Sequence, residues 1–485
     1  MTSGPSAVLI GIDVGTTGVK VISLDPRSAV VVASAAAEYP SVSTPDGGHE
    51  QNPADWWRAV AASCRQVMAA LGGRPVAAVG LSGHMHSLLL LDADGEPVRP
   101  AMTWADRRVG EDTRRLGEIG VFRALGGNGV VDAFTAPKLA WLARTDPNTL
   151  ARARRLVLAK DYIGHLLTGQ WATDETDAIG TLLYDVTTSE WSGELFAAAG
   201  ASVDLAVPVL RSTDSRGAVT ASAAASTGLP AGTTVMAGAG DVSAAVVGAG
   251  VADATRICLN VGTAAQVMGL TSSPTADAGF MFGSALGSGG RHRYISMASV
   301  YAAGASVRWA SRTVLGEKDI NDLAASSVPG SRGLSYLPFM YGAAVPRKND
   351  AVRAAFLGQT DRHGRPELAS AVLEGIAFAC ADAIDAVAAV SGNPAGVRVV
   401  GGVANSLLWR SALASVIDAS VVHVPEGGSE LGAAIIAGLG VGIYDSPADA
   451  MAHLRTVPVR RPSADNISAY QVARARYRSW CELLV

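Results

Sequence analysis

Residues 10–20 of the chain read IGIDVGTTGVK, and residues 257–267 read ICLNVGTAAQV. In both stretches an apolar run leads into a Val-Gly-Thr turn, and a second apolar run follows the turn. This pattern predicts a two-stranded hairpin each time. The predicted strands are Val8–Ile12 and Val19–Leu24 in the first copy, and Arg256–Val261 and Ala264–Leu270 in the second. A repeat separated by about half of the chain predicts two copies of one fold.

The length of the chain also favours two domains. Its 485 residues exceed the roughly 250–300 residues at which a single hydrophobic core stops growing. Glycine and alanine dominate residues 238–252, and no low-complexity linker follows them. We therefore expect an N-terminal domain of residues 1–244 and a C-terminal domain of residues 245–485 that pack closely together.

Outside the hairpins the pattern is that of a mixed α/β fold. A third strand is expected near residues 29–37, a helix over Asn52–Leu71 and a strand over Val76–Ser82. In the second half, Glu367–Val390 has the strongest helical periodicity, and Val397–Val400 reads as a strand. Strands and helices that follow one another in each half predict sheets covered by helices.

Composition excludes several classes of function. The formal net charge is −4, and no stretch concentrates the Lys and Arg that a nucleic-acid partner needs. No run offers the ~20 apolar residues of a membrane helix, and Met1–Ala7 lacks the basic charge of a signal peptide. The four cysteines form neither a CxxC pair nor a Cys/His cluster. We therefore expect a cytoplasmic protein with no nucleic-acid or membrane partner.

The turn of the first hairpin carries the side chains of a phosphate site. Glycine allows a phosphate to approach the backbone N–H groups, and Thr16 and Thr17 add hydroxyl donors. Asp13 supplies a carboxylate for Mg²⁺, and Lys20 on the next strand can reach a phosphate. The alternative is an ordinary hairpin with a polar turn. The P-loop pattern is absent.

Asp241 stands in a stretch of small residues, Gly238-Ala-Gly-Asp241. A carboxylate in such a setting can act as general base for a hydroxyl nucleophile, or it can cap a helix. His86, which follows Met85, can bond a sugar hydroxyl, although a single histidine is more often structural.

Two further turns can be read either as nucleotide-binding turns or as ordinary connections. Gly262-Thr263 matches the first hairpin but is also a common turn. Gly401-Gly402, between a strand and a helix, fits a nucleotide-binding turn or a simple connection, and it lacks the dinucleotide fingerprint.

Together these segments resemble the FGGY family of carbohydrate kinases, and within it the xylulokinases. The resemblance runs almost from end to end, and the order and spacing of the motifs make it specific. The matching segments are IGIDVGTTGVK (10–20), EQNPADWW (50–57), GLSGHMHS (80–87), FTAPKLAWL (134–142), LAKDYIGHLLTGQWATDETDAIGT (158–181), GAGD (238–241), NVGT (260–263), ELASAVLEG (367–375), GGVANSLLWR (401–410) and ELGAAIIAG (430–438).

The resemblance implies two actin-like (ribonuclease H-like) ATPase domains with the active site in a cleft between them, and ATP and Mg²⁺ as cofactors. Asp241 matches the catalytic base and Asp13 the acid that helps to position Mg²⁺, so both are expected at the metal. The nucleotide contacts match Thr16, Thr17, Lys20, Gly262, Thr263, Gly304, Gly402 and Asn405. The sugar contacts match Met85, His86, Trp104 and Asp106, together with Asp241.

This sequence departs from the family mainly on the sugar side. Ala105 and Val242 stand where xylulokinases usually have asparagine, and Gly342–Pro346 replaces a common G-E-R-T-P segment. D-Xylulose is the expected substrate, with ribulose, L-xylulose, xylitol and erythritol as alternatives. An actin-like ATPase or a non-catalytic sugar-binding regulator would be alternatives of another class. The zinc motif of ROK kinases is absent, and the sequence leaves a homodimer open.

Overall fold

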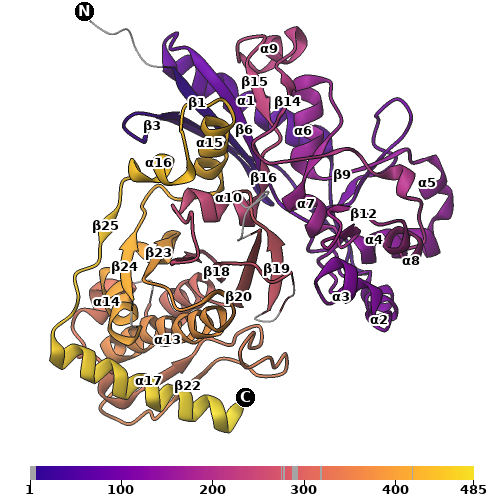
Figure 1. Ribbon diagram of the computed structural model, residues 1–485. Coiled ribbons are helices and arrows are strands. Elements are labelled where there is room, and N and C mark those ends of the chain that lie inside the picture. Colours follow the sequence, from indigo (N-terminus) through magenta and orange to yellow (C-terminus); the bar gives the residue numbers. More distant parts are fainter. Residues whose placement is uncertain (1–6, 275, 277–278, 287–292, 317–318, 418) are drawn as a thin grey trace, which may run out of the picture.

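The computed structural model describes residues 7–274, 276, 279–286, 293–316, 319–417 and 419–485. Figure 1 shows two regions: the first half of the chain, from indigo to magenta, and the second half, from pink to yellow. Each region is built on one large mixed β-sheet. The predicted α/β architecture with two sheets is confirmed.

The first sheet has the strand order β14-β15-β6-β1-β2-β3, and β16 pairs with β6 beside it. Its strands are β1 (Val8–Val14), β2 (Gly18–Asp25), β3 (Val30–Glu38), β6 (Val76–Gly83), β14 (Ser215–Ala218), β15 (Thr234–Met236) and β16 (Ala239–Gly240). β1 and β2 form the predicted antiparallel hairpin, and β1 runs parallel to β6. In this register Asp13 lies opposite Lys20.

The second sheet has the order β19-β20-β18-β17-β23-β24-β25. Its strands are β17 (Arg256–Val261), β18 (Ala265–Thr271), β19 (Phe280–Gly283), β20 (Tyr294–Val300), β23 (Gly396–Val400), β24 (Ser420–His423) and β25 (Val457–Pro458). β17 is antiparallel to β18 and parallel to β23, as β1 is to β2 and β6. The repeat of the Val-Gly-Thr hairpin therefore marks equivalent places in the two sheets.

Two long helices begin and end close to the predicted residues, α1 (Pro53–Leu71) and α13 (Arg365–Ser391). The other main helices are α10 (Asp241–Gly248), α14 (Leu407–Val416), α15 (Ser429–Gly440) and α17 (Ala464–Leu484). Asn52 caps α1, because its side chain accepts the N–H of Ala54 at 3.0 Å. α13 is buried along most of its length, since it forms the centre of the second region's core.

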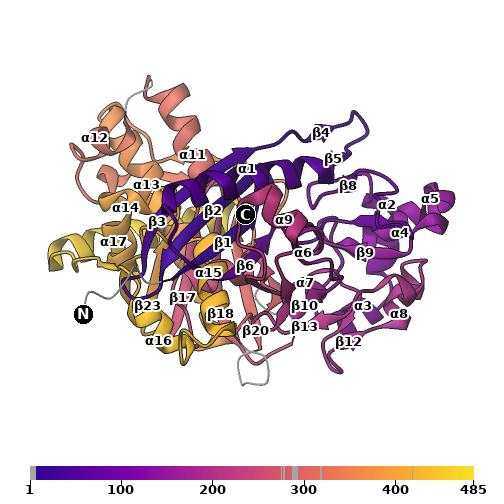
Figure 2. The same cartoon turned by 90° about the horizontal axis from the view of Figure 1, so that it is seen from above.

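Shorter elements fill two excursions from the sheets. Between β6 and β14 they are β7 (Leu89–Leu91), β8 (Ala101–Met102), α2 (Gly110–Gly117), α3 (Val121–Gly126), α4 (Thr135–Thr145), α5 (Pro147–Arg152), β9 (Arg155–Val157), α6 (Ala159–Thr168), β10 (Thr173–Asp174), α7 (Glu175–Gly180), β11 (Tyr184–Asp185), β12 (Glu190–Trp191), α8 (Gly193–Ala198) and β13 (Val209–Leu210). Between β20 and α13 they include α11 (Gly304–Trp309), α12 (Ile320–Ala324), β21 (Ser335–Leu337) and β22 (Ala355–Leu357). Both views place α2, α4, α5 and α8 at the end of the first region that is remote from α13 and α17 (Figure 1 and Figure 2).

Helix α15 belongs to the second half of the chain but packs on the first sheet. It crosses β1 and β6 at Gly11 and Gly80, which are partners in the register of these strands. A Cβ on Gly80 would lie 1.8 Å from the carbonyl oxygen of Ala433. On its other side α15 meets α10 as closely, because a Cβ on Gly432 would lie 1.8 Å from the carbonyl oxygen of Ala244. Glycine at these positions lets α15 sit between the first sheet and α10.

Other expectations concern the boundary between the halves and the surroundings of the chain. The predicted boundary at residues 244 and 245 falls inside α10, and the division into these two domains stays a prediction. In the described part of the chain, no helix combines the length and hydropathy needed to cross a bilayer. Cys64, Cys258, Cys380 and Cys481 are all buried and free.

Candidate active site

The turn between β1 and β2 is held by three side chains from elsewhere in the first region. The hydroxyl of Tyr39 donates to the carbonyl of Gly15. The side-chain amide of Gln51 donates to the carbonyl of Thr16 at 2.6 Å, and the indole N–H of Trp104 donates to the hydroxyl of Thr16 at 2.9 Å. The turn is therefore fixed by its surroundings as well as by its own hairpin.

Asp13, on β1, lies in an acidic environment. Burial, together with the negative charges of Asp241 and Glu430, raises the pKa of Asp13 to about 7. Its Oδ1 atom is buried and accepts no hydrogen bond from the described residues. Lys20 lies opposite in the hairpin, but its ammonium group pairs with Glu430. A carboxylate oxygen left without a donor among other acids attracts a cation.

Asp241 is the first residue of α10, and Gly240 before it is the N-cap position. Its Oδ1 accepts the N–H of Val242 at 2.8 Å, so the side chain satisfies one helix N–H while most of the carboxylate stays available. Burial raises the pKa of Asp241 to about 6. The backbone carbonyl of Asp241 accepts a hydrogen bond from Ser429 at 3.1 Å, which ties α10 to the start of α15. Asp241 therefore lies one residue past the N-cap position that the capping alternative gave it, and its role as general base stays a prediction.

The second hairpin packs against the start of α11. The N–H of Gly304 donates to the carbonyl of Gly262 at 2.9 Å, and the N–H groups of Ala303 and Ala305 donate to the carbonyl of Thr263, each at 3.0 Å. A Cβ on Gly304 would lie 2.5 Å from the carbonyl oxygen of Gly262, so only glycine fits there. Gly262, Thr263 and Gly304, predicted separately as nucleotide contacts, are thus neighbours.

Gly402 and Asn405 lie in a single 3-10 turn, η4 (Gly402–Asn405), and both are exposed. The turn begins beside the second hairpin, because a Cβ on Gly401 would lie 2.6 Å from the carbonyl oxygen of Val261. Gly401 has a φ of 93°, which explains glycine at this position. The structure therefore brings the nucleotide residues predicted in the second half into one place.

The start of α15 and the loop before it contact the first hairpin and the end of β23. Glu430, the second residue of α15, pairs with Lys20 of the first hairpin. A Cβ on Gly427 would lie 2.5 Å from the side chain of Val400, which directly precedes Gly401. Sequence reasoning assigned no role to this loop, although Glu430 opens one of the segments that carry the resemblance.

Met85 and His86 follow the end of β6, and Met85 contacts the residue before Asp241. The side chain of Met85 fills the space beside Gly240, where a Cβ would lie 2.6 Å from its Cγ. Nδ1 of His86 lies 2.6 Å from the carbonyl oxygen of Gly180, so Nδ1 carries the proton and Nε2 remains a free acceptor. Burial lowers the pKa of His86 to about 3, and the ring stays neutral. Phe134 packs edge-on against this ring, with centroids 5.0 Å apart.

Trp104 and Asp106 are placed differently from each other. Trp104 is 39% exposed, although its N–H is engaged by Thr16. Asp106 is fully buried, and its carboxylate accepts bonds from the Arg108 guanidinium and from the backbone N–H of His49 at 3.1 Å. In this structure the Asp106 carboxylate contacts protein groups, and its predicted contact with a sugar stays a prediction.

A buried ionic network supports the turn before Asp241, and sequence reasoning missed it. The ammonium of Lys160 lies 2.6, 2.9 and 3.0 Å from the carboxylate oxygens of Asp161, Asp174 and Asp177, respectively. Asp174 accepts the hydroxyl of Thr176 at 2.7 Å, and that hydroxyl oxygen accepts the N–H of Gly240 at 2.8 Å. These residues stand in the segment 158–181 that carries the resemblance, which was the only signal for them.

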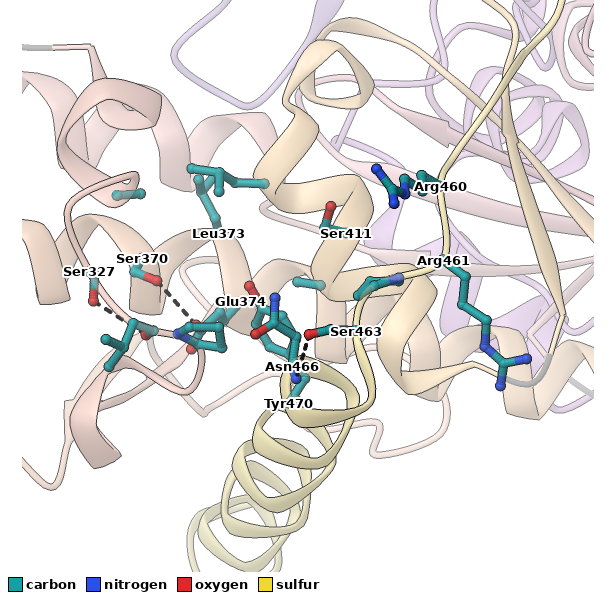
Figure 3. Close-up of a pocket in the computed structure, with 16 residues that line it drawn as sticks. Ser327, Ser370, Leu373, Glu374, Ser411, Arg460, Arg461, Ser463, Asn466 and Tyr470 are labelled. Atoms are coloured by element: carbon teal, nitrogen blue, oxygen red, sulfur yellow. Dashed lines mark hydrogen bonds between the residues drawn. The ribbon is translucent and has the colours of Figure 1, made fainter.

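A cavity of about 580 Å³ opens elsewhere, between α13, α14 and α17 (Figure 3). None of the predicted site residues lines it. Its buried acid, Glu374, already accepts bonds from the N–H of Gly330 and from the hydroxyls of Ser331 and Ser370. The cavity is therefore separate from the residues described above.

The arrangement suits the transfer of a phosphoryl group. Two Gly-Thr hairpins offer N–H groups and hydroxyls to phosphates. Asp13 and Asp241, both partly buried and with raised pKa values, lie close enough for the charge of Asp241 to act on Asp13. Met85 lies beside Gly240, which directly precedes Asp241.

The comparisons with known proteins agree with this chemistry. Residues 8–248 match the N-terminal domain of the FGGY family of carbohydrate kinases, and residues 257–441 match its C-terminal domain. The chain is 34% identical to the xylulose kinase of Escherichia coli (strain K12), over 97% of each chain.

Solved structures share the whole fold. The ligand-bound xylulose kinase from Lactobacillus acidophilus superimposes with a TM-score of 0.90 at 25% identity, over 98% of both chains. A gluconate kinase from the same organism superimposes equally well, with a TM-score of 0.90 at 26% identity over 98% of both chains. The matches to both domain models and the identity along the full length show that this chain belongs to the FGGY family of carbohydrate kinases.

Proposed function

We propose that this kinase transfers the γ-phosphoryl group of ATP to D-xylulose and forms D-xylulose 5-phosphate. The observation that carries the proposal is the Asp241 carboxylate beside Asp13, with a pKa raised to about 6 by burial. Such a carboxylate is ionised at neutral pH and is a stronger base there than an ordinary aspartate.

In the proposed reaction each residue of the site has its own role in the transfer of the γ-phosphoryl group. The Asp241 carboxylate takes the proton of the sugar hydroxyl, whose oxygen attacks the γ-phosphorus as the bond to the β,γ-bridging oxygen breaks and ADP leaves. The turns at Thr16–Thr17 and Gly262–Thr263 hold the phosphates, and Lys20 neutralises their charge. Catalysis of this kind depends mainly on positioning and on charge neutralisation.

The residues fit a magnesium ion that accompanies the nucleotide. The buried Oδ1 of Asp13 has no donor among the described residues, and Mg²⁺ is commonly bound by one or two carboxylates together with substrate phosphates. No group of three or more candidate ligands gathers anywhere in the described ranges, which suits an ion that arrives with ATP. Asp13 and Asp241 would hold the ion, which would neutralise phosphate charge.

Similarity supports a pentulose as the acceptor, and the E. coli relative at 34% identity is named a xylulose kinase. The gluconate kinase of similar fold makes gluconate the second candidate. Gluconate carries a carboxylate, which needs a cation. Lys138 lies close enough to His86 for its charge to lower the pKa of His86, but its ammonium already donates to the carbonyls of Asp132, Ala133 and Phe134 at 2.6–3.0 Å. A neutral sugar therefore suits this site better.

A screen of acceptors tests the proposal. The release of ADP would be followed with D-xylulose, D-ribulose, L-xylulose, xylitol, erythritol, glycerol and gluconate, and the phosphorylated carbon would be located by NMR. We expect the highest kcat/KM with D-xylulose and phosphate on its fifth carbon. A much higher value with gluconate would reject D-xylulose. We also propose a cytoplasmic location and a homodimer, which fractionation and size-exclusion chromatography would check.

A further inference from the structure

The indole N–H of Trp104 donates to the hydroxyl oxygen of Thr16 at 2.9 Å. Similarity assigns these two residues to different substrates, Trp104 to the sugar and Thr16 to the nucleotide phosphates. The hydrogen bond joins them directly, so the indole acts on the turn that is proposed to hold the phosphates.

The chemistry of the two groups decides what this bond does. An indole N–H is only a donor, whereas a threonine hydroxyl has one proton and two acceptor positions. While Thr16 accepts from Trp104, its own proton points elsewhere, and none of the described residues accepts it. Phosphate oxygens accept hydrogen bonds and donate none at full ionisation. The indole thus holds the Thr16 hydroxyl as a donor that is free for a phosphate oxygen.

The indole is mounted rigidly enough to do this. The turn that carries Trp104 is closed by the bond from the N–H of Asp106 to the carbonyl of Thr103 at 3.2 Å. Arg108 clamps the same turn, because its guanidinium pairs with the Asp106 carboxylate and lies 2.6 Å from Glu50.

The same support reaches Thr16 from the other side. Gln51 follows Glu50 in β5 (His49–Gln51) and donates to the Thr16 carbonyl at 2.6 Å. β5 pairs with β8, which directly precedes the Trp104 turn. One small sheet therefore supports both hydrogen bonds to Thr16.

We propose that Trp104 is a positioning residue for the nucleotide, acting through the hydroxyl of Thr16. The inference rests on the proposed function in one respect, since it takes Thr16 as a phosphate contact. It predicts that loss of the indole N–H weakens nucleotide binding even when no sugar is present.

Calorimetric titration of the full chain with Mg²⁺ and the non-hydrolysable analogue AMP-PNP, without any sugar, tests this. Trp104→Phe keeps an aromatic ring and removes the N–H, and Thr16→Val removes the hydroxyl with little change in shape. We expect each to weaken AMP-PNP binding by about tenfold, the order of a net hydrogen bond to a charged group. The double variant should be no weaker than Thr16→Val alone, because the indole acts only through the hydroxyl. Thr16→Ser keeps the hydroxyl and should bind as the wild type does.

Two controls separate positioning from general damage. Adenosine has no phosphate, so its affinity should be equal in the wild type and in Trp104→Phe. Trp171→Phe changes an indole that stacks on His165, outside the site, and should leave AMP-PNP affinity unchanged. Wild-type affinity in Trp104→Phe, or losses that add in the double variant, would overturn the inference while the kinase proposal stands. Failure of the wild type itself to bind AMP-PNP would overturn both.

Discussion

The ammonium group of Lys20 on β2 pairs with the carboxylate of Glu430, which lies 410 positions later in the chain at the start of α15. Lys20 is half-exposed and Glu430 is nearly buried in this pair. The first hairpin, whose turn is predicted to hold phosphates, is thereby joined to the second half of the chain. To neutralise a phosphate, Lys20 has to exchange the carboxylate for a phosphate oxygen.

This pair leads to a prediction for Glu430→Gln. The change removes a negative charge beside the phosphate site and frees the ammonium of Lys20, so binding of AMP-PNP without metal should become several-fold tighter. Calorimetric titration in the presence of a chelator would measure it. Lys20→Met, which removes the cation and keeps the stem, should have the opposite effect. Weaker binding in Glu430→Gln would mean that the pair holds the site together instead of competing with the phosphate.

The second prediction concerns the base. Because burial raises the pKa of Asp241 to about 6, the free enzyme should hold the base in its protonated, inactive form below that pH. Asp13, with a pKa of about 7, has to be ionised as well. The plot of log kcat/KM against pH should therefore bend downward between about pH 7 and pH 6, with a slope that rises from one to two on the acid side. An inflection near the ordinary aspartate value would exclude Asp241 as the group that titrates.

The variant Asp241→Asn checks the same assignment without pH. Phosphorylation should fall by about 10²–10⁴-fold, the usual contribution of a general base, while affinity for AMP-PNP stays within a few-fold of the wild type. Turnover at the wild-type rate would require another base.

The third prediction uses the raised pKa of Asp13. Its folded-state value of about 7 exceeds the ordinary 3.8, so between these values the folded protein binds more protons than the unfolded chain. The free energy of unfolding therefore falls as pH rises through this range. In Asp13→Asn the side chain cannot ionise, so the free energy of unfolding should not fall with pH for this reason. We expect its Tm, measured without ligands, to exceed the wild-type Tm at about pH 8 and to equal it at about pH 4.

The same variant should lose activity through the metal. Its kcat should collapse, because the carboxylate that would meet Mg²⁺ is gone, while sugar affinity is largely kept. A Tm below the wild type at the higher pH would contradict the electrostatic account of this site.

Much of the fold was readable because its signals are local. The two Val-Gly-Thr hairpins, the helix capped by Asn52 and the strongly periodic α13 each depend on neighbours in sequence, and each lies within a few residues of its predicted place. The placement of α15 on β1 and β6 was not readable. It depends on Gly11 and Gly80, which meet a helix more than 300 positions away only in the folded chain.

The candidate site divides in the same way. Residue types and turns pointed to Asp13, Asp241, His86, the first hairpin with Thr16, Thr17 and Lys20, and the turns at Gly262-Thr263 and Gly401-Gly402. Similarity added Met85, Trp104, Asp106, Gly304 and Asn405. The roles of Glu430 and of the Lys160 network were not predicted. Lys160 meets three carboxylates only when α6, α7 and β10 are packed together. The bonds of the Asp106 carboxylate to Arg108 and to the N–H of His49 were also hidden, because the His49 bond forms only when β5 lies beside the Trp104 turn.

The fourth prediction tests the contact that the sequence could not reveal. In Gly80→Ala the new methyl group would lie 1.8 Å from the carbonyl oxygen of Ala433, so β6 and α15 must separate. We expect a loss of stability of roughly 1–3 kcal/mol, the usual range for overpacking, measured by denaturant unfolding. Gly110→Ala is the matched control, because nothing lies within 4 Å of a Cβ there, and it should be close to neutral. Equal stabilities of the two variants would mean that α15 is not seated on Gly80.

The last prediction concerns the substrate and the residue after the base. Val242 is 8% exposed and packs in the same apolar cluster as Met85 and Phe282. The resemblance to the xylulokinases leads us to expect asparagine there, whose amide would bond a hydroxyl of the sugar. A buried hydroxyl without a partner costs roughly 1–3 kcal/mol, about one to two factors of ten in specificity.

Two cases follow for Val242→Asn. If D-xylulose is the native substrate, the new amide finds a sugar hydroxyl, and kcat/KM for D-xylulose should rise or stay equal, even though the free protein loses some stability. If the native substrate presents an apolar face to Val242, the amide is left unpaired and kcat/KM for that substrate should fall. Steady-state kinetics of both proteins with D-xylulose and with the best acceptor of the screen separate the cases. A large fall with D-xylulose, together with high wild-type activity on another polyol, would reject D-xylulose. The phosphoryl transfer itself would stand, because Asp13, Asp241 and both hairpins are untouched by the change.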